Sequence, residues 1–269
     1  MSKLPPAPSG PRTPSATTPV VATVVVPTLN EATALPRVLG PLRQAAARHR
    51  LELVVSDGGS TDGTLAYALG VADRVVVHRG PGRQTIGAGR NAGARVAAGG
   101  VLLFFNADVG FPDDLDGFLA DLIAAAREHG AATCRVAVRP EEATWMDRVV
   151  LTACDGIFRT WNALGRGMGR GECHAVRRDV FEAVGGYREA LAAGEDFDLF
   201  DRIAREGKKR RKAGAVGFRV RFLWDRTLYE DPRRYRKLGY PRVLTAWALN
   251  SLWVTFRGRS FHQDWKPVR

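Results

Sequence analysis

Cysteine is scarce in this chain of 269 residues, which contains three cysteines and no Cys-x-x-Cys pair. An odd number of cysteines without that spacing argues against a disulfide framework and a structural zinc site, and it favours a reducing compartment. Long apolar runs are also absent, so the sequence predicts no membrane-spanning helix. Residues 1–19 contain six prolines and no apolar core, which predicts a disordered tail and not a signal peptide.

Acidic residues are few toward the C-terminal end of the chain. In total, 40 Lys and Arg residues outnumber 28 Asp and Glu residues, which gives a formal net charge of +12. Residues 1–200 hold 21 basic and 22 acidic residues, whereas residues 201–269 hold 19 and 6. The positive charge is therefore local, and its explanation must come from what residues 201–269 contact.

Apolar, β-branched runs alternate with helical stretches over the first half of the chain. Strands separated by helices at short spacing indicate βαβ units and a mainly parallel central sheet. We therefore predict one α/β domain over residues 20–230, followed by a basic, Trp-containing helical segment over residues 231–269. The predicted strands are 20–26, 51–56, 73–78, 101–105 and 131–138, and the predicted helices are about 32–48, a short one after residue 63, 91–98 and 111–130, with a glycine-rich connection at 80–89.

Polar side chains follow four of these strands at the point where each strand ends. Ligands of open α/β sheets bind outside the carboxyl ends of the strands. One such cluster is ordinary turn chemistry, but four in succession indicate a site. A carboxylate that leaves a buried strand can hold Mg²⁺ or Mn²⁺ against a diphosphate. The residues concerned are Thr28, Asn30 and Glu31 after the first strand, Asp57 after the second, Arg83 and Arg90 after the third, and Asn106 and Asp108 after the fourth.

A second acidic cluster occupies residues 194–201, at the start of a predicted helix that reaches about Glu206. Acidic side chains in a first helical turn interact favourably with the helix dipole, so capping alone accounts for them. Glu195 and Asp196 are adjacent, however, and they follow glycine-rich loops. A carboxylate in that position can act as a general base toward an acceptor hydroxyl, and the residue pattern leaves both interpretations open.

Five segments, in this order, resemble family 2 glycosyltransferases of the GT-A fold. The resemblance extends from about Val20 to Arg236 and implies a Rossmann-like, mainly parallel sheet flanked by helices. It also implies inverting transfer of a sugar from a nucleoside-diphosphate sugar to an acceptor hydroxyl or phosphate. The segments are VVVPTLNEA (24–32), VVSDGGSTDGT (54–64), GAGRNAGARVAAGGVLLFFNADV (87–109), RRDVFEAVGGYRE (177–189) and GEDFDLFDRI (194–203).

The resemblance also implies roles for individual residues. Arg90 would approach the diphosphate, and a late basic motif would close over it. The first two loops would line the pocket for the base and ribose. The implied donor-binding residues are Pro27, Thr28, Asn30, Glu31, Asp57, Arg90, Asn106, Arg233 and Arg234.

By the same resemblance, Asp108 would be the principal ligand of a divalent cation, Mg²⁺ or Mn²⁺. Asp196 would be the catalytic base, with Glu195 beside it. Two positions depart from the family pattern. Asn106 stands where the metal motif begins with Asp, which weakens one metal ligand, and Gly58 stands where many members carry a second Asp, which leaves the nucleotide base open.

The basic end of the chain contains an uncharged stretch between Arg242 and Arg257, with Trp247 and Trp253 in it. As a helix it would reach about 21 Å, short of the roughly 30 Å hydrocarbon core of a bilayer. Two interpretations stay open: the helix packs on the domain's own sheet, or it lies on anionic lipid with its tryptophans at headgroup level. Either is compatible with pairing of two chains, so a homodimer also stays open.

Two shorter segments precede that stretch. KKRRK (208–212) is expected to be a solvated loop, and residues 216–222 alternate as a strand does, with Arg219 and Arg221 on one face.

The competing functions differ in what they require of the sequence. A dinucleotide oxidoreductase requires Gly-x-Gly-x-x-Gly in the first βα turn, where this chain has PTLNEA. The alternative to a transferase is a basic nucleic-acid- or membrane-surface-binding protein without that activity. No nucleic-acid partner is expected, because the aromatic residues of 233–259 are mixed with Leu and Val. We expect a cytoplasmic enzyme, with attachment to the inner face of the membrane and a lipid-linked acceptor as open possibilities.

Overall fold

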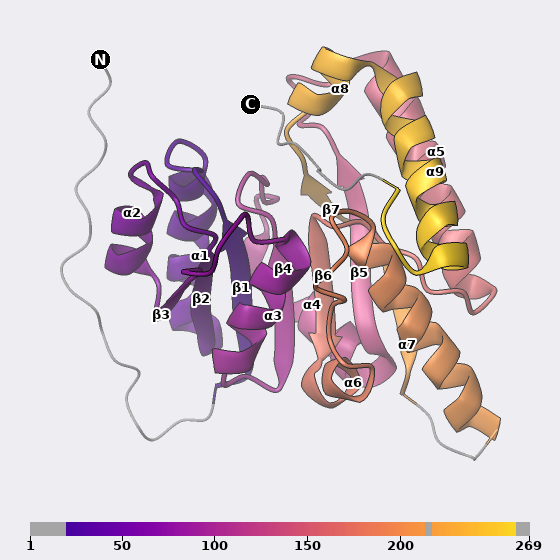
Figure 1. Ribbon diagram of the computed structural model, residues 1–269, viewed down its shortest axis with the longest axis horizontal. Coiled ribbons are helices and arrows are strands. Elements are labelled where there is room, and N and C mark those ends of the chain that lie inside the picture. The colour runs from indigo at the N-terminus through magenta and orange to yellow at the C-terminus, as the bar shows by residue number, and fades with distance from the viewer. Residues whose placement is uncertain (1–19, 213–216, 262–269) are drawn as a thin grey trace.

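A computed structural model describes residues 20–212 and 217–261, which form one seven-stranded sheet with helices on both faces (Figure 1). The strand order is β3-β2-β1-β4-β6-β5-β7. The predicted tail, residues 1–19, lies outside the described residues. The strands are β1 (Ala22–Thr28), β2 (Leu51–Asp57), β3 (Arg74–Val77), β4 (Val101–Phe105), β5 (Gly130–Ala137), β6 (Cys173–Arg177) and β7 (Arg219–Tyr229).

The helices alternate with the strands as far as β5 and then predominate toward the C-terminus. Among the described residues, no helix is long and apolar enough to cross a membrane. The helices are α1 (Leu35–His49), α2 (Thr64–Val71), α3 (Ile86–Val96), α4 (Leu115–His129), α5 (Trp145–Ala163), α6 (Arg178–Ala183), α7 (Glu195–Lys212), α8 (Arg233–Leu238) and α9 (Tyr240–Arg257).

The sheet is mainly parallel, which confirms the sequence prediction. Strands β3, β2, β1 and β4 pair in parallel, and so do β5 and β7. Strand β6 runs antiparallel to both β4 and β5 and joins the two parallel groups. Strand β1 extends through Pro27, which the sequence placed after the strand. Its ladder with β4 ends at Val25, so the missing N–H of Pro27 costs no hydrogen bond on that side.

Two helix boundaries differ from the sequence prediction. Helix α3 begins at Ile86, inside the expected glycine-rich connection, because the Thr85 side chain caps it by accepting a hydrogen bond from the Ala88 N–H. Helix α7 continues to Lys212, so residues 208–212 are helical and not a loop. An ion pair one turn apart, Arg210 Nε to Glu206 Oε1 at 2.8 Å, supports this last part.

Three elements were not predicted at all, namely α5, β6 and the short α6 that follows β6. Helix α5 begins in a capping box, in which the side chains of Thr144 and Asp147 bond each other's backbone N–H groups. Strand β6 follows it along the chain. The predicted strand 216–222 is the start of the longer β7, and its first residue lies outside the described residues.

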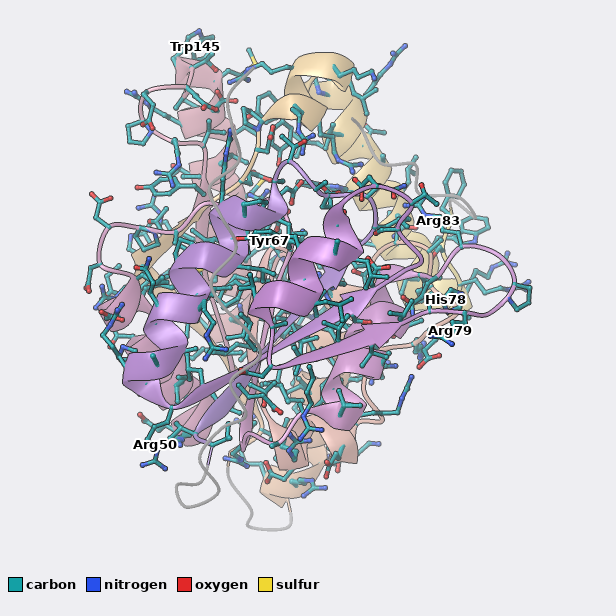
Figure 2. The ribbon with its side chains drawn as sticks, turned by 90° about the vertical axis from the view of Figure 1, so that its left-hand side faces the viewer. Arg50, Tyr67, His78, Arg79, Arg83 and Trp145 are labelled. Atoms are coloured by element: carbon teal, nitrogen blue, oxygen red, sulfur yellow. The ribbon has the colours of Figure 1, made fainter. Side chains whose placement is uncertain are left out.

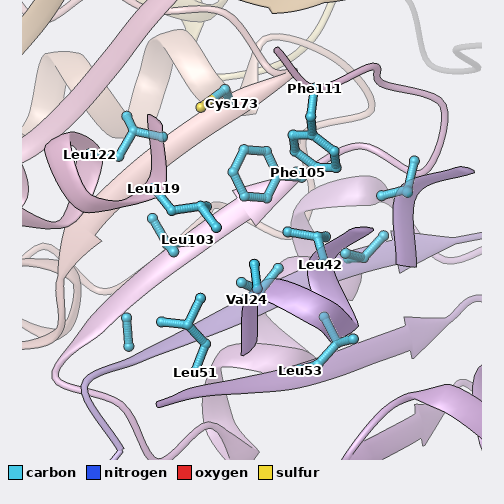
Figure 3. Packing of buried hydrophobic residues seen from close by; sticks show 14 of the residues in the cluster. Val24, Leu42, Leu51, Leu53, Leu103, Phe105, Phe111, Leu119, Leu122 and Cys173 are labelled. Atoms are coloured by element: carbon cyan, nitrogen blue, oxygen red, sulfur yellow. The ribbon is translucent and has the colours of Figure 1, made fainter. Parts of the chain in front are cut away.

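Both faces of the sheet are covered at its centre, which explains why β1 and β4 are apolar without alternation, whereas the edge strand β7 alternates. On one face, Val24, Leu103 and Phe105 pack with Leu42 of α1 and Leu119 of α4 (Figure 3). On the other face, side chains of β1, β2 and β4 pack with α3, α6 and α7. The carboxyl ends of the strands are therefore held from both sides.

The last two helices are attached to α5 by a buried carboxylate. Asp147 accepts hydrogen bonds from the Arg236 guanidinium of α8 and from the Tyr240 hydroxyl of α9. Gly239, with a φ of 76°, makes the break between α8 and α9 that lets both donors reach it. Burial alone would raise the pKa of Asp147, but the bonds from Arg236, Tyr240 and Thr144 outweigh it and hold the pKa well below its ordinary value.

We predict that Asp147→Ala lowers the free energy of unfolding by about 3 kcal/mol at neutral pH, because it leaves buried donors without their acceptor. The pKa of Asp147 is depressed in the folded state, so this stabilisation is present above the unfolded pKa and is lost as the pH falls below it. Urea unfolding measures the effect. The control Asp116→Ala removes an exposed carboxylate paired with Arg48, and an equal loss there would contradict the assignment.

Candidate active site

A cavity of about 380 Å³ lies at the carboxyl ends of β1, β2 and β4 and is closed by residues from α5, α7, α8 and α9. Of the twelve residues singled out from the sequence, all but Asn30 and Asp57 line it. Those that do are Pro27, Thr28, Glu31, Arg90, Asn106, Asp108, Glu195, Asp196, Arg233 and Arg234. The rule that ligand-binding residues gather at strand ends therefore identified part of the wall, namely Thr28, Glu31, Arg83, Arg90, Asn106 and Asp108.

Asn30 and Asp57 shape the loops next to the cavity instead of lining it. The buried Asp57 carboxylate accepts hydrogen bonds from the hydroxyls of Thr28 and Ser60, at 3.0 and 2.6 Å. Asn30 adopts a φ of 55°, and its side-chain oxygen accepts from the Thr61 N–H at 2.7 Å. Both residues thus join the first loop to the second, and the expectation that they contact the donor stays a prediction.

Arg90 lies fully buried below the cavity and joins three elements. One guanidinium nitrogen donates to Glu195 Oε1 at 2.9 Å, and another donates to Asn106 Oδ1 at 2.9 Å and to the carbonyl of Gly171. These contacts tie the end of β4 and the loop before β6 to the start of α7. The resemblance implied that Arg90 approaches a diphosphate, but its guanidinium is directed to these protein groups.

Glu195 and Asp196 begin α7 and are both buried. Burial raises the pKa of Asp196, and the neighbouring Glu195 charge raises it further against the opposing effect of Arg90. Burial also raises the pKa of Glu195, but Arg90 is its direct ion-pair partner and offsets much of this. Asp196 is therefore the carboxylate with the higher affinity for a proton, which is the property a general base near neutral pH requires.

Asp108 follows β4 on another part of the cavity wall. Its carboxylate accepts a hydrogen bond from Arg233 at 3.3 Å. Burial raises its pKa, Arg233 lowers it, and the negative charges of Glu172 and Asp231 raise it again. Asp108, Glu172 and Asp231 therefore interact with one another, and Arg233 pairs with both Asp108 and Asp231.

Glu172 is a cavity residue that the sequence did not reveal. Its carbonyl accepts from the N–H of Asn106 at 3.3 Å, because the antiparallel pairing of β6 with β4 brings the two residues together. Glu172 Oε2 is buried without a hydrogen-bond partner among the described residues, and it lies 3.4 Å from Arg170 Nε. The sequence would have revealed Glu172 only if β6 had been recognised as a strand, but β6 is only five residues long and contains a buried histidine.

These side chains could hold a divalent cation only if bound substrate or water supplied further oxygen ligands. The described residues contain no group of three or more His, Cys, Asp or Glu side chains placed to hold a metal ion. Mg²⁺-type sites often use one or two carboxylates and complete their coordination with substrate phosphates and water. Asp108 and Glu172 meet that requirement, because Glu172 Oε2 accepts no hydrogen bond among the described residues although it lies 3.4 Å from Arg170 Nε. Asn106 Oδ1 already accepts a hydrogen bond from Arg90.

A second cavity, of about 750 Å³, lies between the ends of α5 and α9 and one side of α7. Phe197 lines both cavities, so the two are neighbours. Trp161 and Leu252 form part of its apolar wall, and Arg166 and Lys208 are among its basic residues. The acidic start of α7 thus has a cavity on either side of Phe197.

The fold is that of the GT-A glycosyltransferases. The chain belongs to glycosyl transferase family 2, whose family model matches residues 23–185. Membership of this family supports the transferase hypothesis over the alternative of a basic binding protein without activity.

Two curated relatives are named as biosynthesis proteins. The chain is 30% identical over 194 residues to the succinoglycan biosynthesis protein ExoA of Rhizobium meliloti, which covers 68% of this chain and 58% of that protein. It is 37% identical over 89 residues to the PGL/p-HBAD biosynthesis glycosyltransferase Rv2957 of Mycobacterium tuberculosis, covering 32% of this chain and 34% of the relative. The chain therefore spans less than two thirds of the length of these relatives.

Solved structures show the same fold at low sequence identity. The mannosyltransferase PcManGT from Pyrobaculum calidifontis, in complex with GDP-Man and Mn²⁺, superposes with a TM-score of 0.60 at 23% identity, over 88% of this chain and 63% of that one. Glucosyl-3-phosphoglycerate synthase from Mycobacterium tuberculosis, in complex with Mn²⁺, UDP-glucose and phosphoglyceric acid, gives 0.54 at 16% identity, over 86% and 77%.

We predict that Asp196→Asn stabilises the fold while it removes the carboxylate. The pKa of Asp196 is higher in the folded state than in the unfolded state. At pH values between these two pKa values, the native state binds more protons than the unfolded state, so the free energy of unfolding falls as the pH rises through that range. The asparagine variant escapes this loss, and its Tm should exceed that of the wild type by about 3 °C at mildly alkaline pH and by less at acidic pH.

Thermal unfolding at several pH values tests this. The control is Asp201→Asn, which changes a more exposed carboxylate on the same helix. A gain that is the same for both variants, or that shrinks as the pH rises, would show that Asp196 is not destabilised by its charge.

Proposed function

We propose that this glycosyltransferase is an inverting enzyme that transfers a sugar from a nucleoside-diphosphate sugar to an acceptor hydroxyl or phosphate, with Asp196 as the base. The observation that carries the proposal is the buried carboxylate pair of α7 in the wall of the same cavity as Asp108. The complexes of PcManGT with GDP-Man and of the mycobacterial synthase with UDP-glucose support a nucleotide-sugar donor.

The donor would lie across the ends of β1 and β4. Thr28 and Glu31 would contact its base and ribose, with Asn30 and Asp57 holding the loops that carry them. Arg233 and Arg234 line the cavity beside Asp108 and would attract the diphosphate. Since Arg90 is committed to Glu195, these two late arginines are the better candidates for that contact.

Asp108 and Glu172 would hold a divalent cation, Mg²⁺ or Mn²⁺, together with the diphosphate oxygens. When bound, the cation would stabilise the negative charge that develops on the departing nucleoside diphosphate. Mn²⁺ in both structural neighbours supports this choice of ion class.

Asp196 would accept the proton of the acceptor hydroxyl while that oxygen forms a bond to the anomeric carbon. The bond from the anomeric carbon to the diphosphate oxygen breaks in the same step, and the electron pair leaves with the nucleoside diphosphate. Attack opposite the leaving group inverts the anomeric configuration. Glu195, held by Arg90, would position Asp196 and keep its pKa high.

We further propose that the acceptor is lipid-linked and that the protein works in the cytoplasm at the inner face of the membrane. The apolar, Trp-containing helices next to the cavity support this location. Residues 231–269 would form the segment that brings the transferase domain, residues 20–230, to the lipid. Pairing of two chains stays the alternative use of that segment.

We predict that a guanosine or uridine diphosphate raises the Tm of the wild-type protein only when Mn²⁺ is present, because ligands that bind the native state stabilise it. Ligand at about 100 times its dissociation constant adds roughly 2.7 kcal/mol, which a thermal-shift assay resolves. Asp108→Asn should lose the Mn²⁺-dependent part of the shift. Asp113→Asn, an exposed carboxylate five residues further along, should keep it.

We also predict that Asp196→Asn lowers kcat about 100-fold or more, the usual contribution of a general base. The wild-type rate should rise with pH through the elevated pKa of Asp196, which must be deprotonated to act. Glu195→Gln should move that rise to lower pH, because it removes the charge that elevates the pKa. Initial rates of donor turnover across the pH range test both, with the exposed Glu182→Gln as control. An unchanged pH profile in Glu195→Gln would contradict the proposed positioning.

A further inference from the structure

Helices α5 and α9 lie side by side and run in the same direction (Figure 1). At their starts, the Tyr240 hydroxyl of α9 donates to Asp147 of α5. Near their ends, Trp161 of α5 and Leu252 of α9 line the same cavity. At 1.5 Å per residue, the longer helix extends for about 28 Å, so the pair forms a broad ridge on the molecule.

This ridge exposes apolar side chains that an ordinary surface helix would bury. Trp145 and Leu164, at the two ends of α5, are each 71% exposed. Figure 2 shows Trp145 at the outer end of the ridge, away from the sheet. Apart from Met146, the exposed apolar residues on α5 recur at intervals of four, eight, four and three positions, which are close to whole helical turns, so they form one broad stripe along the helix. The exposed apolar residues of the pair are Trp145, Met146, Val149, Ile157, Trp161 and Leu164 from α5 and its C-cap, and Leu249, Leu252 and Trp253 from α9.

The charge on the same ridge is of one sign. Helices α8 and α9 contain no acidic residue, and the two in α5, Asp147 and Asp155, are each only 1% exposed. Arginines and a lysine are exposed among the apolar residues, and the nearest exposed carboxylates along the chain lie just before the helices: Glu141 and Glu142 before α5, and Asp231, paired with Arg233, before α8. The exposed basic residues are Arg148, Arg159, Arg236, Lys237, Arg242 and Arg257.

Arginine and tryptophan also meet directly at the ends of both helices. The guanidinium of Arg166 lies 4.7 Å from the ring centre of Trp161, and that of Arg257 lies 5.4 Å from Trp253. A cation above an amphipathic ring is the arrangement that suits the headgroup region, where phosphates attract the cation and the ring reaches the acyl chains.

We propose that the exposed residues of α5 and α9 form a docking face for an anionic phospholipid bilayer, with both helices lying in the plane of the interface. Hereafter this set of residues is the α5–α9 face. Interfacial helices of this kind insert roughly 5–10 Å, and each basic residue adds to the attraction by anionic lipid. The sequence pointed only to residues 233–259, whereas the structure adds the longer and more exposed stripe of α5.

A bilayer matches the face better than a second copy of this chain does. A symmetric dimer would place the same patch against itself, so the arginines would face arginines without exposed carboxylates to pair with them. A nucleic acid would neutralise the arginines but would leave Val149, Ile157 and Leu164 exposed to water. An anionic bilayer satisfies both the charge and the apolar stripe.

The face also lies beside the active-site cavity. Phe158 of α5 and Trp247 and Asn250 of α9 line that cavity, so the same two helices border both. Docking would therefore hold the cavity close to acceptors embedded in the bilayer. This consequence rests on the proposed function, whereas the docking itself does not.

Flotation of the full chain with lipid vesicles tests the proposal without donor or acceptor. We expect binding to vesicles of phosphatidylglycerol and phosphatidylcholine, much weaker binding to phosphatidylcholine alone, and weakening by salt. The combined variant Trp145→Ser, Val149→Ser and Leu164→Ser should bind the vesicles at least about tenfold more weakly than the wild type, since it removes apolar area from the interface. Leu69→Ser is the matched control, because Leu69 is 58% exposed on α2, at the other end of the sheet.

The charge is tested separately. Arg148→Glu and Arg242→Glu should each weaken binding to the anionic vesicles at least about fivefold. Arg37→Glu, an identical charge change on the exposed side of α1, should have a small effect. Equal losses in Arg37→Glu would mean that only net charge matters and would overturn the assignment of the face.

Three further outcomes would overturn the proposal: no flotation of the wild type, equal binding to neutral and anionic vesicles, or a dimer in sedimentation that the Trp145, Val149 and Leu164 substitutions dissociate. Salt-sensitive oligonucleotide binding that Arg148→Glu abolishes, without flotation, would assign the face to nucleic acid. The Mn²⁺-dependent thermal shift of the same variants, measured without vesicles, reports the proposed function independently. A retained shift without flotation would reject the docking face alone.

Discussion

The buried guanidinium of Arg90 is the interaction on which the arrangement of the active site depends. A fully buried charge is stable only when it is paired and hydrogen-bonded, and Arg90 meets this with Glu195, Asn106 and the Gly171 carbonyl. These partners come from α7, the end of β4 and the loop before β6. One side chain therefore fixes the acidic start of α7 relative to the strand end that carries Asp108.

That arrangement has an energetic cost which the fold compensates elsewhere. Two adjacent buried carboxylates repel each other, and the single cation below them neutralises Glu195 more directly than Asp196. The raised pKa of Asp196 is the measure of what the site gives up in stability. Well-packed strands buried on both faces supply the compensation, since they hold the strand ends without help from the site.

The sequence predicted the elements that local residue patterns determine. It failed where contacts between residues far apart in the chain determine the structure. Strand β4 has the predicted bounds because an apolar five-residue run between turns has few alternatives, and the strand-end rule placed Asp108 at the cavity. Asp196, which begins a helix, was singled out from its acidic cluster and the family resemblance. The start of α3 depends on a threonine cap and the end of α7 is supported by an ion pair, and hydrophobic periodicity does not detect either contact. Glu172 reaches the cavity only through the pairing of β6 with β4, and Arg90 contacts a partner 105 residues away.

The positive charge of the C-terminal part does not have a single use. Arg236 bonds Asp147 and thereby attaches α8 to α5, while Arg233 pairs with Asp108 at the cavity. Arg242 and Arg257 are exposed on α9, which contains no carboxylate. Because the first two arginines have protein partners and the last two lie among exposed apolar side chains, the excess of basic residues divides into a structural part and an outward-facing part. A polynucleotide would account for the outward arginines only. An anionic membrane accounts for the arginines and for the apolar stripe between them. The exposed arginines require a partner with negative charge, and the apolar side chains beside them require that the same partner also has an apolar interior.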